Sequence, residues 1–293
     1  MRYIVLVFGV FCCSTAVLWI KASAIDPVLL SGYRLILGAC LLSPLFFSAR
    51  KRYPNIVNRQ FWHGIWPAAG LLALHFISWN IGARMTPAAN ASLIVNVTPI
   101  AMPFFLIFLL KERLTRAEIY GTILAMAGVF LLGLSDFNTS PEYFLGDVIA
   151  FISMLLYAAY LAWSRLNKHI PSIYLYVVPV YGLAGVISLV LAVPYAAAVG
   201  GIPLLGENVW KELTMIAGLA LVPTIMGHSI INWGMQKLRG QVVAIVNLGQ
   251  FIFAGIMAWF ILKETPTIGF FIAVGLVITG AIIVVRGHQQ KDS

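Results

Sequence analysis

The chain has 293 residues, of which 61% are apolar and only 10% are charged, and its formal net charge is +9. Soluble domains usually have about a quarter of their residues charged, so this composition excludes an ordinary water-soluble fold and indicates a membrane protein. The positive charge does not require a nucleic-acid partner, because the sequence contains none of the aromatic and basic motifs that nucleic-acid-binding domains use.

Apolar stretches of about 20 residues, the length that crosses roughly 30 Å of hydrocarbon, recur from one end of the sequence to the other. They predict an all-α membrane protein of ten transmembrane helices with short connections. The predicted helices are residues 3–20, 28–48, 62–82, 88–110, 118–134, 147–164, 173–199, 213–235, 241–262 and 267–286. Prolines inside these helices interrupt backbone hydrogen bonding and are expected to permit bends; they are Pro99, Pro103, Pro179 and Pro223.

Two parts of the sequence repeat at a nearly constant spacing. An offset of 152 residues relates Lys111 to Lys263, Ala117 to Gly269, Gly121 to Ala273 and Gly128 to Gly280, and an offset of 151 relates Asn96 to Asn247. The chain is therefore predicted to consist of two related five-helix halves, residues 1–138 and 139–293. Since each half crosses the membrane an odd number of times, the halves are inverted relative to each other around a central cavity, which suits alternating access. The small residues are expected to serve close packing within the chain more than dimerisation.

The distribution of basic residues predicts the orientation. With ten crossings, fourteen of the nineteen Lys and Arg residues fall on the side that holds both termini, and four fall on the other side. The positive-inside rule then puts both termini in the cytoplasm of a multi-pass protein of the plasma (inner) membrane. Residues 1–24 also resemble a cleavable signal peptide, but the first helix is expected to remain, because its removal would leave nine helices and unequal halves.

Short motifs at fixed places in the predicted helices carry a resemblance to a known family. They are Pro27 followed by Arg34, Pro99, Leu110-Lys111-Glu112-Arg113-Leu114, Leu145-Gly146-Asp147, Tyr157-Ala158-Ala159-Tyr160 and Leu262-Lys263-Glu264. Their order, the helix number and the duplication resemble the drug/metabolite transporter superfamily, specifically its ten-helix branch of paired EamA domains, over nearly the whole chain. The resemblance implies a secondary transporter that exports a small metabolite, such as an amino acid or a related amphipathic compound.

The sequence departs from the family pattern at three places expected near the cavity. Cys12-Cys13-Ser14 stands where the family often has Trp-Gly-Ser, Gln250 where a proline is common, and Tyr157 where Trp is frequent. The substrate of a well-known member should therefore not be transferred to this chain. Import, exchange or facilitated passage of an anionic or neutral metabolite remains the alternative, because sequence predicts topology and not the direction of flux.

Polar side chains inside lipid are costly unless they face the interior of the bundle, so they indicate the transport pathway. The candidate substrate-binding residues are Ser14, His75, Trp79, Asn96, Tyr157, Tyr160, His228, Asn232, Asn247 and Gln250. They predict a cavity with aromatic walls and amide and imidazole groups, suited to a small zwitterionic or neutral amphipathic solute. The alternative for each of these residues is helix packing or a hydrogen bond between helices.

Arg34 is the only basic residue well inside a predicted span. It lies about two helical turns from the outer end, so its long side chain is expected to extend outward. It would then anchor the helix at carbonyl groups or lipid headgroups, or bind a carboxylate or phosphate at the outer mouth, which a guanidinium group suits.

Motifs for chemistry are missing from the sequence. There is no nucleotide-binding G-x-x-x-x-G-K-[ST], no G-x-S-x-G and no H-E-x-x-H, so ATP hydrolysis, catalytic residues, metal and cofactor are not expected. An intramembrane enzyme with His75 or His228 as base is the least supported alternative. If protons are coupled to transport, these two histidines titrate in the required range. The expected partners are a small-molecule substrate and the lipid bilayer, with no nucleic acid and a monomer or weak homodimer.

Overall fold

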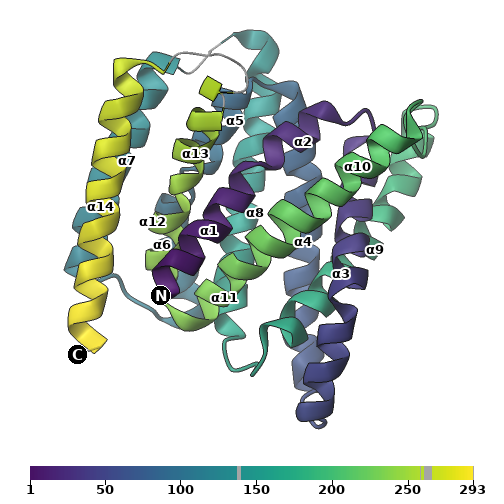
Figure 1. The fold of residues 1–293 in the computed structure, drawn as a ribbon, viewed down its shortest axis with the longest axis horizontal. Helices are drawn as coiled ribbons and strands as arrows, with labels where there is room; N and C mark the ends of the chain where they lie inside the picture. The colour runs from purple at the N-terminus through teal and green to yellow at the C-terminus, as the bar shows by residue number, and fades with distance from the viewer. Residues whose placement is uncertain (137–139, 258, 261–265, 293) are drawn as a thin grey trace.

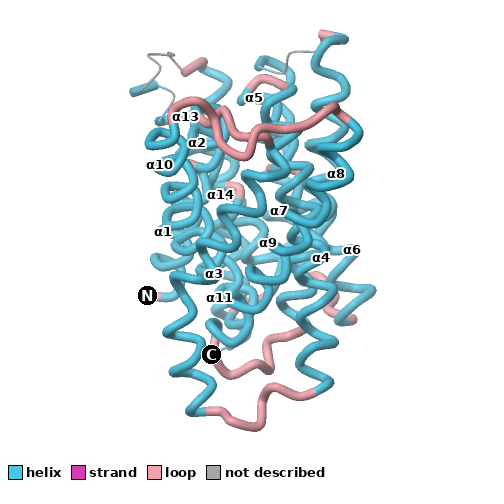
Figure 2. Tube along the Cα trace, turned by 90° about the vertical axis from the view of Figure 1, so that its right-hand side faces the viewer, coloured by secondary structure: helices cyan, strands magenta, loops and turns pink. Residues whose placement is uncertain are grey.

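The computed structural model describes residues 1–136, 140–257, 259–260 and 266–292. The regular elements of this described part are helices, packed side by side in one bundle (Figure 1). Their axes run mainly in one direction, with loops at the two ends (Figure 2). The elements of the first half are α1 (Arg2–Ser14), α2 (Ala16–Ala22), α3 (Pro27–Arg52), α4 (Arg59–Met85), α5 (Ala88–Val95), α6 (Thr98–Leu110) and α7 (Arg116–Asp136).

The second half continues in the same way. Its elements are η1 (Pro141–Tyr143), α8 (Phe144–Leu166), α9 (Ile173–Ala198), α10 (Val209–Leu219), η2 (Ala220–His228), α11 (Ser229–Lys237), α12 (Gly240–Asn247), α13 (Gly249–Met257) and α14 (Ile268–Asp292). The motif Leu262-Lys263-Glu264 lies outside the described residues. Both chain ends lie toward the lower end of Figure 1, opposite the end that α2, α5 and α13 reach.

Among the described residues, nine helical stretches are long and apolar enough to cross a bilayer. Helix α4, with 27 residues, is as long as these stretches but more polar, because it contains His63, His75 and Asn80. The outer surface of the bundle carries large exposed apolar side chains such as Phe108 and Phe130, as expected for contact with lipid. The described residues therefore form the all-helical structure of a multi-pass membrane protein, with nine to ten candidate spans.

Polar residues before the helices set where several of them begin. The side chain of Asp26 accepts a hydrogen bond from Val28 N at 2.8 Å, and Pro27 occupies the first turn of α3. Asn58 caps α4 in the same manner, with Oδ1 2.9 Å from Phe61 N. Each cap satisfies a backbone N–H that has no partner inside its helix, so the loops enter the bundle at defined positions.

Several spans are interrupted near their middle. Helices α1 and α2 meet at Thr15, α5 and α6 meet at Asn96 and Val97, and α12 and α13 meet at Leu248. Segment η2, which contains Pro223, is a stretch of π-helix, the wider turn that often marks functional places in helices. Pro223 thus lies in a stretch of altered helical geometry, whereas Pro103 lies inside the continuous helix α6; the bends expected at these prolines stay a prediction. The matched asparagines, Asn96 and Asn247, both stand at a break.

Helices α7 and α14 approach each other through small residues of this one chain. A Cβ atom added to Gly121 would lie 2.6 Å from the carbonyl oxygen of Gly280, and one added to Gly128 would lie 2.9 Å from the carbonyl oxygen of Ala273. Backbones can come so close only where side chains are absent or small. The matched small residues therefore pack within the chain, as predicted.

Candidate functional site

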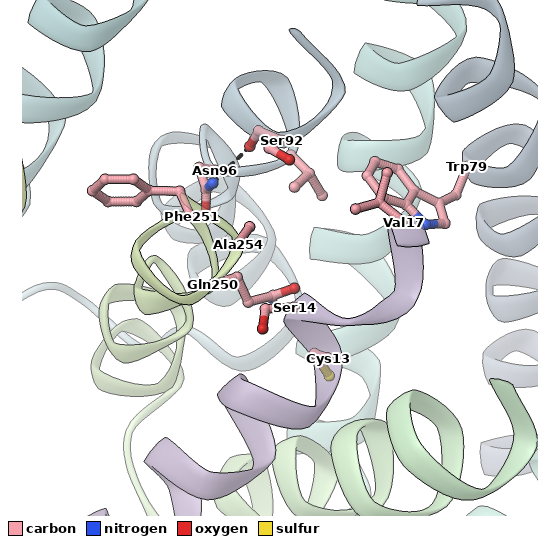
Figure 3. A pocket seen from close by; sticks show the side chains of 10 residues that line it. Cys13, Ser14, Val17, Trp79, Ser92, Asn96, Gln250, Phe251 and Ala254 are labelled. Atoms are coloured by element: carbon pink, nitrogen blue, oxygen red, sulfur yellow. Dashed lines mark hydrogen bonds between the residues drawn. The ribbon is translucent and has the colours of Figure 1, made fainter. Parts of the chain in front are cut away.

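A small pocket lies between α1, α2, α4, α5 and α13, in the half of the bundle away from the chain termini (Figures 1 and 3). Its interior volume is about 20 Å³, about the space of one water molecule, and it is partly open to the outside. Its lining residues are Cys13, Ser14, Val17, Trp79, Ser92, Val95, Asn96, Gln250, Phe251 and Ala254. Four of the ten candidate residues from the sequence, namely Ser14, Trp79, Asn96 and Gln250, thus meet at one place, and they come from both halves of the chain.

The polar groups of this pocket are held by neighbours in the chain. Ser14 Oγ donates to Phe11 O at 2.6 Å, and Asn96 Nδ2 donates to Ser92 O at 2.6 Å. Gln250 Nε2 donates to Asn247 Oδ1 at 2.7 Å. These bonds fix the side chains before any solute binds, which lowers the entropic cost of recognition. The pocket combines amide and hydroxyl groups with the apolar face of Trp79.

His75, Phe76, Tyr157 and His228 form a packed aromatic cluster beside the pocket. His75 stacks on Tyr157 with ring centroids 4.7 Å apart. His228 packs in edge-to-face geometry against Phe76 and Tyr157, with ring centroids 4.8 Å and 5.6 Å apart. Ser153 holds His75, since the ring Nδ1 lies 2.9 Å from the serine Oγ. The ring centroids of the two histidines are 6.2 Å apart, so the structure brings these two candidate residues together, but in a closed cluster outside the pocket lining.

Asn247 connects this cluster to the pocket. It interacts with the hydroxyl group of Tyr157 on one side and accepts the hydrogen bond of Gln250 on the other. Asn232 and Tyr160, by contrast, bind each other: Asn232 Nδ2 donates to Tyr160 Oη at 2.7 Å, and both side chains are fully buried. This contact joins α11 to α8, which is the helix-bridging alternative for these two residues.

Arg34 differs from its sequence-based expectation. Its side chain is fully buried and does not reach the outer surface, so the prediction that it extends outward is wrong. Its Nε donates to Thr224 Oγ1 at 2.9 Å, and its guanidinium carbon lies 4.2 Å from the centre of the Phe76 ring. The attraction between the cation and the aromatic ring, together with the hydroxyl acceptor, turns the guanidinium group toward the interior.

Ion pairs that no motif in the sequence predicts bridge the termini end of the bundle. Arg165 Nε lies 2.8 Å from Glu112 Oε2, and Arg239 Nε lies 2.5 Å from Glu118 Oε1. Arg165 also donates to the carbonyl oxygens of Met235 and Leu238. The hydrogen bond with Glu118 raises the pKa of Arg239 above its usual range, because it favours the charged form. Each pair joins a glutamate of the first half to an arginine of the second.

Two further residues of the site region were missed. Ser153 fixes His75 from α8, and Phe76 contacts both Arg34 and His228. Ser153 lies four residues before Tyr157, on the same face of its helix, so helical spacing could have revealed it. Phe76 gave no such signal, since one more phenylalanine in an apolar span looks like ordinary packing.

A multi-span helical bundle with a small pocket lined by both halves of the chain is typical of a membrane transport protein. Residues 1–134 and 144–286 match the EamA-like transporter family, so the chain belongs to that family. Transporters of this kind bind a small-molecule substrate and are embedded in a membrane, and the protein is a transporter and not an enzyme.

Named relatives and a solved structure are consistent with this membership. The chain is 28% identical over 283 residues to a probable amino-acid metabolite efflux pump of Escherichia coli K12, covering 91% of this chain and 88% of that one. It is 29% identical over 196 residues to the aromatic amino acid exporter YddG of Ancylobacter novellus, covering 64% and 62%. A solved structure titled "Crystal structure of protein" matches with a TM-score of 0.77 at 20% identity, covering 100% and 99%, which establishes the fold alone.

Proposed function

We propose that this transporter is a secondary carrier that exports a small amphipathic solute, an amino acid or a related zwitterionic or neutral compound, across the plasma membrane by alternating access. The observation that carries the proposal is the pocket, in which Ser14, Trp79 and Asn96 of the first half meet Gln250 of the second half. A solute bound there touches both halves, so movement of one half against the other would change its access. The two named relatives, an exporter and an efflux pump, support this direction.

The proposed division at residues 138 and 139 into two inverted repeats has support from the contact between α7 and α14. In the sequence repeat, Gly121 corresponds to Ala273 and Gly128 corresponds to Gly280. The contact of Gly121 with Gly280 therefore corresponds to a contact of Ala273 with Gly128, and both contacts are present. As residue numbers rise along α7, from Gly121 to Gly128, those of their partners in α14 fall, from Gly280 to Ala273. The two helices are therefore antiparallel. A twofold axis across the bundle produces this relation, and such an axis defines an inverted repeat.

The ion pairs of Glu112 and Glu118 with Arg165 and Arg239 support a closed gate at the termini end. They join the two halves on one side of the pocket, whereas the pocket itself lies toward the opposite side. With both termini in the cytoplasm, as the basic residues indicate, this state would be closed to the cytoplasm. Transport then requires these pairs to separate in the other half of the cycle.

Counterflow in proteoliposomes tests the carrier proposal. Vesicles are loaded with one unlabelled amino acid at a time, and uptake of the same radiolabelled amino acid is followed, with vesicles lacking protein as the control. A carrier accelerates labelled uptake when the interior is loaded, whereas a simple pore does not. If no amino acid or related amphipathic compound gives accelerated exchange, the proposed substrate class is wrong.

Topology is tested separately by labelling single cysteines at positions 111 and 263 with a membrane-impermeant reagent in intact cells. Position 263 lies outside the described residues, so its place rests on the repeat in the sequence. We expect reaction at 263 only, and reaction at 111 only after the membrane is opened. Labelling of both positions from the same side would exclude inverted halves.

A further inference from the structure

Arg34 leaves most of its hydrogen-bonding capacity unused inside the bundle. Its Nε is bound to Thr224, but neither Nη1 nor Nη2 has a hydrogen-bond partner among the described residues, and the side chain is fully buried. The ion pairs among the described residues use Glu112 and Glu118, at the termini end of the bundle, and pair them with Arg165 and Arg239. The positive charge of Arg34 thus has no carboxylate partner in the described structure.

A third buried nitrogen without a partner lies nearby, on His228. His228 Nδ1 has no hydrogen-bond partner among the described residues. Its ring centroid is 4.8 Å from that of Phe76, and the same Phe76 ring lies 4.2 Å from the guanidinium carbon of Arg34. The two side chains that carry these three unsatisfied nitrogen atoms therefore both pack against the Phe76 ring. A buried charge without a partner is strongly unfavourable, so a negatively charged group is expected here during the cycle.

The guanidinium group lies close behind the wall of the pocket. Cys13 lines the pocket, and its Sγ is 3.9 Å from the carbonyl oxygen of Pro223 in η2. Thr224, the next residue, binds Arg34. Cys13, Pro223 and Thr224 thus form a continuous chain of contacts from the pocket lining to the cation. The π-helical turns around Pro223 have weaker backbone hydrogen bonding than an α-helix, which makes a local rearrangement easier.

We propose that Arg34 binds the carboxylate group of the transported solute through Nη1 and Nη2, while Nε stays on Thr224. The assignment rests on the proposed carrier function and extends it, because it names the substrate class as amphipathic carboxylates. A single guanidinium group balances the single charge of a carboxylate, whereas a phosphate group carries up to about two charges. The planar guanidinium fork also matches the two carboxylate oxygens, which a lysine ammonium group cannot do.

Ligand-induced thermal stabilisation of the purified full-length chain in detergent tests the assignment. The probes are L-phenylalanine, sodium phenylacetate and L-phenylalaninamide, the last of which has the same ring and amine but no carboxylate. We expect stabilisation by the two carboxylates and not by the amide. In Arg34→Gln the apparent Kd for the carboxylates should rise about tenfold or more, since hydrogen bonds to a charged group are lost, and Arg34→Lys should retain part of the binding.

The matched control is Arg84→Gln, because Arg84 already donates to the carbonyl oxygens of Ile20 and Ser23. This variant should bind the carboxylates as the wild type does. Equal stabilisation by the amide, stabilisation by phosphate or chloride in place of carboxylates, or no stabilisation by any probe overturns the assignment. Should Arg34→Gln fail to fold, the wild-type comparison of acid with amide and the folded Arg34→Lys variant decide.

Failure of the carrier proposal gives a different pattern. Carboxylate binding that depends on Arg34 without counterflow of any amino acid would refute the proposed transport and leave the Arg34 assignment standing. Counterflow of L-phenylalaninamide as fast as that of L-phenylalanine would do the reverse.

Discussion

The contact between α7 and α14 allows a prediction worked from the backbone. In Gly280→Ala the new Cβ would lie 2.5 Å from the carbonyl oxygen of Gly121 and 3.0 Å from the backbone nitrogen of Ala125. These neighbours are backbone atoms, which cannot turn aside as a flexible side chain can. The two helices must therefore separate or shift along each other.

The magnitude follows from two opposing effects. Inserting a methyl group into a tightly packed contact costs about 1–3 kcal/mol, and replacing glycine by alanine in a helix returns up to about 1 kcal/mol. Because the new Cβ meets backbone atoms, the upper half of that packing cost applies, and the net loss is about 1–2 kcal/mol. A loss of 1 kcal/mol lowers Tm by roughly 2–4 °C in proteins of about 150–250 residues. Gly280→Ala is therefore expected to lower Tm by roughly 2–8 °C.

The assay is thermal unfolding of the purified protein in one detergent, with Gly275→Ala as the matched control. Gly275 lies on the same helix α14, and a Cβ added there would have nothing within 4 Å. Its variant should have an unchanged or slightly higher Tm, because only the helix preference remains. If Gly280→Ala is as stable as Gly275→Ala, the close antiparallel contact is wrong, and with it the main support for inverted halves.

The gate and the pocket give two further predictions. Glu112→Gln removes a charge from the ion pairs, which destabilises the closed gate by about 1.5–3 kcal/mol. A cysteine at position 238 (Leu238→Cys) should then react roughly tenfold faster with a thiol reagent in inverted vesicles. Glu142→Gln, on the exposed η1, is the control, and equal rates in both variants would argue against a gate. Trp79→Ala should raise the half-saturating solute concentration in counterflow about tenfold, since burying an aromatic side chain contributes about 1.5–3 kcal/mol. Trp66 is exposed on the same helix, so Trp66→Ala should leave this concentration unchanged. The same increase in both variants would show that Trp79 does not bind the solute.

Much of the fold follows from the sequence because apolar length and the lipid core determine it. The spans begin and end close to the predicted residues, as at α9, predicted as 173–199 and observed as Ile173–Ala198. The breaks are harder to predict. Pro223 indicates some bend, but the π-helical form of η2 and the break at Thr15 depend on packing against neighbouring helices, which a single span does not encode.

The candidate site could be predicted in part, because the helical pattern of the sequence shows which polar residues face the interior. Periodicity and the repeat identify Asn96 and Gln250 as interior residues, and both line the pocket. Which interior polar residues bind each other is decided by partners far away in the sequence, as with Asn232 and Tyr160. The outward direction predicted for Arg34 is wrong because the depth of a residue in its span does not reveal its neighbours. Phe76 and Thr224 contact the side chain and turn it inward.

The most direct measurement of alternating access uses Cys13, which lines the pocket. In a chain with Cys12→Ala and Cys40→Ala, a membrane-impermeant thiol reagent is applied to intact cells and, separately, to inverted vesicles. Alternating access predicts that Cys13 reacts from both sides and that a transported solute slows both reactions. Reaction from one side only, whether or not solute is present, would contradict it.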